Sequence, residues 1–316
     1  MDALHTTLLP LFAAIGVGFA VGRLKLFSSD EVRVLSRFVF QVAMPIAIFA
    51  FMQRATPPSP AYGGLIAGYL AGLAIVTAAG LLVARRIGGL NLNEAGVAVF
   101  TVVCGNAVFL GLPVALTVEG WATPFLVLMI FEGSLAYAIG HALITWPKNE
   151  DNGGDKAAQI WVSVRGALHR SFTNPIVLAV IFGLMVSVTP LTLPPALDSA
   201  ASFFGRIASP MGLFILGVYL TSLKGPKGKA QWQLLSLLLL LKLAVFPLVT
   251  GGFTYALTGN STLALVGAFL TGMPPAVSAM VMASTYRLWE GGTTAIVGVG
   301  TIVGLGTVTL FLLTVL

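Results

Sequence analysis

Two long apolar segments of this sequence, residues 94–117 and 262–284, are interrupted near their centres by glycine and proline. Proline lacks a backbone N–H and clashes with the carbonyl group one turn earlier, so it breaks the hydrogen-bond ladder of a helix. The half-helices that result present free N–H groups and partial positive charge at their N-termini, which favour a carboxylate or a similar anion. Their C-termini present carbonyl groups that could hold a cation. The sequence therefore predicts paired helix breaks that bind a small ion.

The predicted binding groups lie in these two segments. The Asn106 side chain can donate and accept hydrogen bonds, and we expect it to orient an anion. The neighbouring glycines and prolines are expected to leave backbone groups free. They are Gly111 and Pro113 in the first segment and Gly272, Pro274 and Pro275 in the second. The alternative interpretation is that these prolines are kinks of the kind that membrane helices tolerate.

Charged side chains inside apolar segments mark further candidate sites, because a charge at the bilayer centre costs about 2.5–3.5 kcal/mol even on insertion scales. Lys242 is expected to attract an anionic substrate, to replace a coupling cation or to take part in proton coupling. Glu132 lies at a similar depth and could pair with it; the alternative for Lys242 is snorkelling or a purely structural pair. Gln41 and Arg206 occupy equivalent positions before Pro45 and Pro210, where a cavity role and a capping role both remain open.

The composition indicates a membrane protein. The chain has 316 residues, of which 57% are hydrophobic and 9% are charged, whereas a soluble domain carries about 25% charged residues. One cysteine excludes an internal disulfide and a cysteine-based metal cluster. No HExxH pattern, phosphate-binding loop or catalytic pair appears in the sequence, so we expect neither an enzyme nor a bound cofactor or metal.

Ten apolar stretches are long enough to cross a bilayer, which needs about 20 residues in a helix. Their patterning is continuously apolar rather than alternating, which predicts helices and not barrel strands. The stretches are 4–22, 34–53, 62–84, 94–117, 123–146, 174–190, 199–222, 231–258, 262–284 and 293–316.

The basic residues predict the orientation of these helices. Nearly all of them fall in loops after the odd-numbered stretches, whereas Arg54 alone lies in a loop on the other side. Cytoplasmic loops carry the excess of Lys and Arg, so both termini are expected outside a bacterial cytoplasmic membrane. This asymmetry explains the net charge of +6 without a nucleic-acid partner.

The polar stretch 147–170 divides the chain into 1–146 and 171–316, with five stretches in each part. Pro10, Gly18 and Pro45 recur as Pro175, Gly183 and Pro210 at an offset of 165, and Gly111–Pro113 matches Gly272–Pro274 at an offset of 161. Because five is odd, the second part enters the membrane from the opposite face. The sequence thus predicts two inverted five-helix repeats, the common architecture of secondary transporters.

Three runs carry a resemblance to a known family: NAVFLGLPVAL at 106–116, NPIVLAVIFGLMVS at 174–187 and GMPPAVSAMVMASTY at 272–286. They resemble the auxin efflux carriers, whose bacterial members are described as permeases for malonate, malate or other organic acids. The resemblance covers nearly the whole chain. Unlike plant members, this chain has a short central loop, no acidic residue directly before Tyr286 and no acidic–lysine pair in 62–84, which argues against auxin itself.

The resemblance also implies a fold similar to bile-acid symporters and sodium/proton antiporters. In these proteins the fourth and ninth helices cross at their prolines, and a panel-like scaffold supports a moving transport domain. Helices 1, 2, 6 and 7 would form the scaffold, and helices 3–5 and 8–10 the transport domain. A homodimer through the scaffold is possible by analogy with relatives.

The sequence as a whole favours a secondary transporter that moves a small organic anion by alternating access. The anion is expected between the breaks of helices 4 and 9, held by Asn106 and backbone N–H groups with Lys242 nearby. A coupling H⁺ or Na⁺ is possible. The alternative is an anion channel or a transporter-like sensor.

Overall fold

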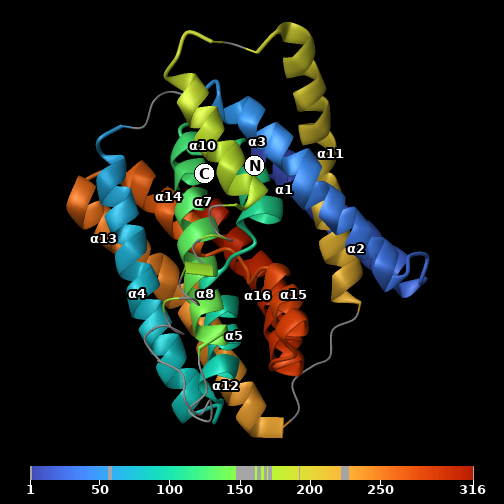
Figure 1. The fold of residues 1–316 in the computed structure, drawn as a ribbon, viewed down its shortest axis with the longest axis vertical. Helices are drawn as coiled ribbons and strands as arrows, with labels where there is room; N and C mark the ends of the chain where they lie inside the picture. The colour runs from blue at the N-terminus through green and yellow to red at the C-terminus, as the bar shows by residue number, and fades with distance from the viewer. Residues whose placement is uncertain are drawn as a thin grey trace.

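The computed structural model describes residues 2–55, 59–146, 161, 165–166, 169, 173–191, 193–221 and 228–315. These residues are helical with no β-strand, as the composition predicts, and contain one isolated antiparallel bridge (Figure 1). The elements are α1 (Asp2–Arg23), α2 (Ser29–Phe38), η1 (Val39–Ala43), α3 (Met44–Met52), α4 (Tyr62–Arg86), α5 (Leu92–Val103), η2 (Ala107–Gly111), α6 (Leu112–Ala115), α7 (Ala122–Phe131), η3 (Glu132–Ala136), α8 (Tyr137–Ile144), α10 (Pro175–Ser187), α11 (Pro195–Leu220), α12 (Gly228–Leu240), η4 (Leu241–Val245), α13 (Phe246–Thr258), α14 (Ser261–Thr271), α15 (Ser278–Tyr286) and α16 (Glu290–Val315).

Six helices in the described part of the chain are long and apolar enough to cross a membrane. They are Asp30–Met52, Tyr62–Arg86, Ala122–Ile144, Pro195–Leu220, Gly228–Thr258 and Glu290–Val315. Shorter apolar helices occupy the other four predicted stretches, at Phe12–Arg23, Leu92–Val103, Pro175–Ser187 and Ser261–Thr271. The protein is therefore a multi-pass, all-helical chain, while the prediction of ten crossings in two inverted repeats stays a prediction.

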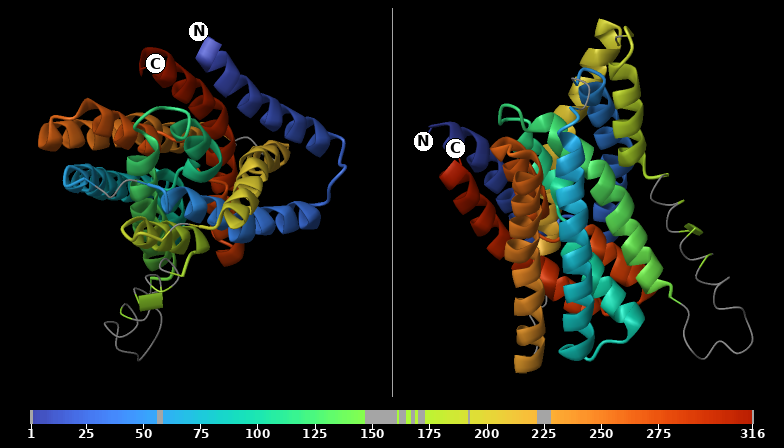
Figure 2. Two further views of the ribbon diagram at one scale, coloured as in Figure 1. Left: turned by 90° about the horizontal axis from the view of Figure 1, so that it is seen from above. Right: turned by 90° about the vertical axis from the view of Figure 1, so that its left-hand side faces the viewer.

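The helices pack in two groups. α1 packs along α11, and α3 packs against α10 and α11. α4 packs against α13 and α5, α13 against α14, and α5 against α8. Figures 1 and 2 place α4 and α13 at the opposite edge of the molecule from α1 and α11.

Glycine allows the closest of these helix contacts. A Cβ added at Gly68 of α4 would overlap the side chain of Thr254 and lie 2.8 Å from its backbone nitrogen. Gly18 of α1 is likewise covered by the backbone of Phe214 in α11. Small residues let membrane helices approach closely enough for van der Waals packing, which replaces the hydrophobic effect inside lipid.

Four π-helical turns interrupt the long helices, and three of them surround one region. η2 directly follows Asn106, η3 begins at Glu132, and η4 contains Lys242. Single π turns inside α-helices occur frequently at functional sites. Composition and hydropathy do not reveal these turns.

Candidate functional site

Two interrupted helices meet in the middle of the molecule. The first runs from α5 to α6 and breaks at Cys104–Asn106, and the second runs from α14 to α15 and breaks after Gly272. Gly105 and Pro275 form the antiparallel bridge between the breaks. The Asn106 N–H donates to the Pro274 carbonyl over 2.7 Å, and the Ala276 N–H donates to the Cys104 carbonyl over 3.1 Å. Each break thus satisfies backbone groups of the other.

The first break lies earlier in the chain than the sequence suggests. Gly111 and Pro113 were expected at the interruption, but Gly111 closes the turn η2 and Pro113 lies in the first turn of α6. The widened turn accommodates this proline: the N–H of Leu112 bonds to the carbonyl of Ala107, five residues back. The offset that aligns Gly111 with Gly272 therefore does not relate the two breaks.

Both downstream half-helices begin at the crossing. One is the continuous helical segment of η2 and α6, residues 107–115, and the other is α15, which starts at Ser278. The first turn of a helix has N–H groups without intrahelical acceptors, and it carries the positive end of the helix dipole. Two such ends meeting in one place can hold a negatively charged group.

A cavity of about 430 Å³ opens at these helix starts, and we call it the crossing cavity. It is lined by η1, the two breaks, η3, α8 and the beginnings of α10 and α15. Its lining includes Asn106, Glu132 and Gln41 from the sequence prediction, together with Ser278 and His141. Ser278 escaped the sequence reasoning because its segment reads as an ordinary apolar span; only the proline pair four and three residues earlier signals its position.

Asn106 is the side chain best placed to bind a guest in this cavity. It is only 4% exposed, and its amide nitrogen has no hydrogen-bond partner among the described residues. A buried polar group without a partner costs free energy, roughly 1–3 kcal/mol, unless a ligand or water satisfies it. That Asn106 orients an anion stays a prediction.

Two buried charges flank the crossing at Gly105. The Glu132 carboxylate accepts a hydrogen bond from the Gly105 N–H over 2.8 Å. The Lys242 ammonium lies close to the same glycine: a Cβ built on Gly105 would lie 3.0 Å from Lys242 Nζ and 3.2 Å from Glu132 Oε1. Lys242 is fully buried, lies 5.2 Å from the centre of the Phe246 ring, and is absent from the cavity lining. A side chain at this position would press on Lys242, Glu132 or Met273, so glycine lets the three approach the backbone closely.

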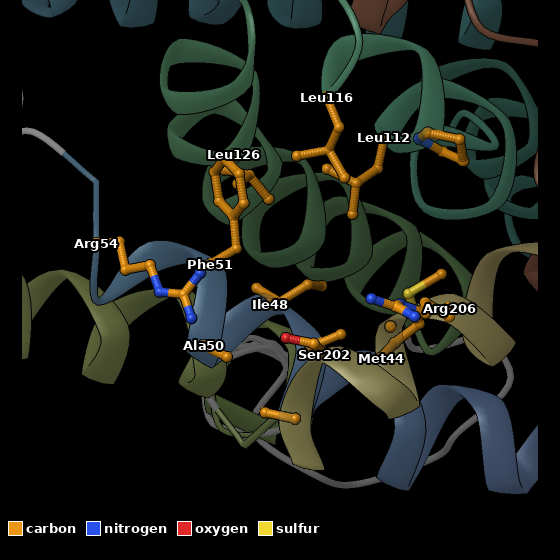
Figure 3. A pocket seen from close by; sticks show the side chains of 14 residues that line it. Met44, Ile48, Ala50, Phe51, Arg54, Leu112, Leu116, Leu126, Ser202 and Arg206 are labelled. Carbon is orange, nitrogen blue, oxygen red and sulfur yellow. The ribbon is translucent and has the colours of Figure 1, made fainter. Parts of the chain in front are cut away.

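A second cavity, of about 350 Å³, lies between α3, α6, α7 and α11, and we call it the arginine cavity (Figure 3). Pro113 and Arg206 line it, so the structure separates these predicted residues from Asn106. Arg206 and Gln41, which are equivalent by the repeat, thus face different cavities.

Of the remaining predicted residues, one lines a third cavity and the other three pack against neighbouring helices. Gly272 lines a small third cavity of about 100 Å³. A Cβ on Gly111 would lie 2.6 Å from the Phe125 ring, and Pro274 and Pro275 pack on Gly304 and Gly300 of α16. Pro274 still contributes its carbonyl group to the crossing.

Comparison with known proteins identifies the family of the chain. The family described as Membrane transport protein matches residues 3–312 of the chain. A curated protein of Rhizobium meliloti (strain 1021), named "Putative malonate transporter", is 23% identical over 310 residues, which cover 95% of this chain and 92% of that protein.

Proposed function

Because the chain belongs to the Membrane transport protein family, the family of the auxin efflux carriers, we propose that it is a secondary transporter for a small organic anion. A carboxylate such as malonate, malate or an auxin-like acid is the expected cargo, and the malonate assignment of the relative points to the same class. The single observation that carries the proposal is the unpartnered Asn106 amide, which faces a cavity where two half-helices begin.

The carboxylate would bind in the crossing cavity. Backbone N–H groups of the first turns after Asn106 and Val277 would donate to its oxygens, and the Asn106 amide would supply a further donor. Hydrogen bonds to a charged acceptor contribute about 1.5–3 kcal/mol each, more than bonds between neutral groups. The crossing would therefore select a negative group without needing a metal ion.

Lys242 and Glu132 would support this site from behind the backbone. The ammonium and the carboxylate that anchors the Gly105 N–H both lie close to the position that a Cβ of Gly105 would occupy. Such a fixed positive charge would favour an anion in the cavity and would change the dependence of transport on membrane potential. A coupling H⁺ or Na⁺ remains compatible with this arrangement.

Alternating access would move one helix group against the other. In this proposal the ten stretches form two inverted repeats in a bacterial cytoplasmic membrane, with both termini outside. Helices α1–α3, α10 and α11 would form the scaffold and the contact of a homodimer, and the interrupted helices would move with α4, α7–α8, α12–α13 and α16. The packing of α3 on α10 and α11, apart from that of α4 on α13, fits this division.

Purified protein in liposomes, supplied with labelled mono- and dicarboxylates, tests the proposal. We expect uptake that saturates with concentration and accelerates when the same acid is present inside, because a carrier must return its site. Flux that rises linearly and shows no such counterflow would indicate an anion channel instead. Absence of binding and flux for every acid of the panel would refute the assignment.

A further inference from the structure

The arginine cavity contains a positive charge that has no partner within the described part of the chain. Its walls are mostly apolar, including Ile48, Phe51, Leu112 and Leu126, and Figure 3 shows Arg54 and Arg206 at opposite ends of them. Arg54 forms an ion pair with Asp198. Arg206 has neither an ion pair nor a hydrogen bond within the described part of the chain. Arg206 is therefore the free cation of this cavity.

The position of Arg206 makes this charge notable. It lies eleven residues after Pro195, the first residue of α11, which corresponds to roughly 16 Å along the helix axis. Charged side chains at such a depth in a membrane protein face the protein interior or an aqueous cavity and mark substrate pathways. Arg206 is exposed and lines an apolar pocket, with no partner among the described residues, so its guanidinium is able to pair with a carboxylate.

Three interrupted helices each line both cavities, with different residues facing each cavity. They are the helices that contain η1 and α3, η2 and α6, and α7 and α8. Along the helix that contains η1 and α3, Gln41 lines the crossing cavity, and the arginine cavity is lined by Met44, Ala47, Ile48, Ala50, Phe51 and Arg54. Along α7 and α8, Leu126 faces the arginine cavity, whereas Glu132 and His141 face the crossing cavity. The two cavities therefore occupy opposite halves of the membrane-spanning region.

The boundary between the cavities is an aromatic contact. Phe109 lines the crossing cavity, packs against Phe40 with ring centres 4.4 Å apart, and covers Gly212 of α11. One turn later, Leu112 and Pro113 already line the arginine cavity. Phe109 thus separates two compartments on the same half-helix.

We propose that the arginine cavity is a second binding site for the transported organic acid, reached from the Arg54 face, where Arg206 pairs with the carboxylate and the apolar walls hold the hydrocarbon part. This inference rests on the proposed transport function. Gln41, the repeat equivalent of Arg206, lines the crossing cavity and carries no charge. The cavities on the two faces of the protein therefore bind the acid with different affinities. Among the residues that the structure describes, the cavity has one unpaired cation, so it favours a monocarboxylate with an apolar body over a compact dicarboxylate.

Sided transport measurements test the second site. Membrane vesicles of the two orientations give the half-saturation concentration of a transported monocarboxylate separately at the Arg54 face and at the His141 face. We expect Arg206→Gln to raise it at least tenfold at the Arg54 face and to change it less than twofold at the His141 face. Arg206→Lys keeps the charge and should restore most of the affinity. Arg54→Gln is the matched control, because that arginine lines the same cavity but is already paired.

The outcomes separate this inference from the proposed function. The second site alone would be refuted if the wild type transports the acid saturably and Arg206→Gln has the same half-saturation concentrations as the wild type at both faces. A defect of Arg206→Gln that appears only in vesicles containing anionic phospholipid would assign the cavity to a lipid headgroup and also refute it. Failure of the wild type to bind or move any acid would refute the transport function itself. Melting curves of the purified variants exclude misfolding as the cause of a defect.

Discussion

The backbone nitrogen of Asn106 donates a hydrogen bond of 2.7 Å to the carbonyl oxygen of Pro274, which joins the two interrupted helices at their crossing. This bond occupies the main-chain nitrogen of Asn106, whereas its side-chain nitrogen is buried without a partner among the described residues, and the residue lines the crossing cavity. The main-chain nitrogen of Asn106 thus joins the helices, and its side chain is left for the proposed binding of the acid. A mutation of the side chain can therefore change binding without breaking the helix crossing.

Asn106→Ala should weaken binding of the transported acid and leave the fold intact. The side-chain nitrogen has no protein partner to lose, whereas a hydrogen bond to a carboxylate contributes about 1.5–3 kcal/mol, or about tenfold or more in affinity. Half-saturation concentrations and melting temperatures check both halves of this statement. Asn260→Ala, which removes only the cap that accepts from the Leu263 N–H, is the control and should cost stability but not affinity. Unchanged affinity in Asn106→Ala would remove this residue from the site.

Gly105→Ala should destabilise the crossing. The added methyl group would lie 3.0 Å from Lys242 Nζ and 3.1 Å from Met273 Cβ, so at least one neighbour must move. Overpacking of this kind costs about 1–3 kcal/mol. Thermal unfolding in detergent measures the effect. Gly80→Ala is the matched control, since its new methyl group meets only Val99, at an ordinary 3.5 Å. Equal melting temperatures for the two variants would contradict the close approach at Gly105.

Lys242 and Glu132 should be energetically coupled through their shared position at Gly105. Removing one of two buried opposite charges leaves the other uncompensated, whereas removing both can be nearly neutral. We expect Lys242→Met and Glu132→Gln each to lower stability, and the double variant to lose less than the sum, with a coupling above about 0.5 kcal/mol. Melting temperatures of the four proteins give this coupling. Strict additivity would show that the two charges act independently.

Lys242→Met should also alter how transport depends on membrane potential, because it removes a fixed charge from the middle of the membrane-spanning region. Uptake measured in liposomes at several imposed potassium diffusion potentials checks this point. The same dependence as in the wild type would leave Lys242 with a structural role only.

Cys104 should report on access to the crossing cavity. It is the only cysteine of the sequence, lines the cavity with 3% of its surface exposed, and lies 3.7 Å from the Ser278 hydroxyl. A membrane-impermeant thiol reagent should label it slowly, from the His141 face, and a transported acid should protect it. The Cys104→Ala variant gives the background. Equal labelling from both faces would contradict the sided cavity.

The sequence by itself determined the class of protein and the extent of most helices. The stretch predicted at 62–84 is α4 at Tyr62–Arg86, because hydropathy over about 20 residues is a local property that lipid enforces on each segment separately. Asn106 and the proline pair at 274–275 could likewise be singled out, since helix-breaking chemistry is written in neighbouring residues.

Only the tertiary structure decided which of these groups meet. It moved the first break from Gly111 to Cys104–Asn106, brought Lys242 and Glu132 to the same glycine, and separated Arg206 from Gln41 into two cavities. Each of these outcomes depends on contacts between segments that are distant along the chain, where a π turn shifts the facing of every later residue in a helix. Local patterns name the residues able to do chemistry, but their distances arise from how whole helices pack.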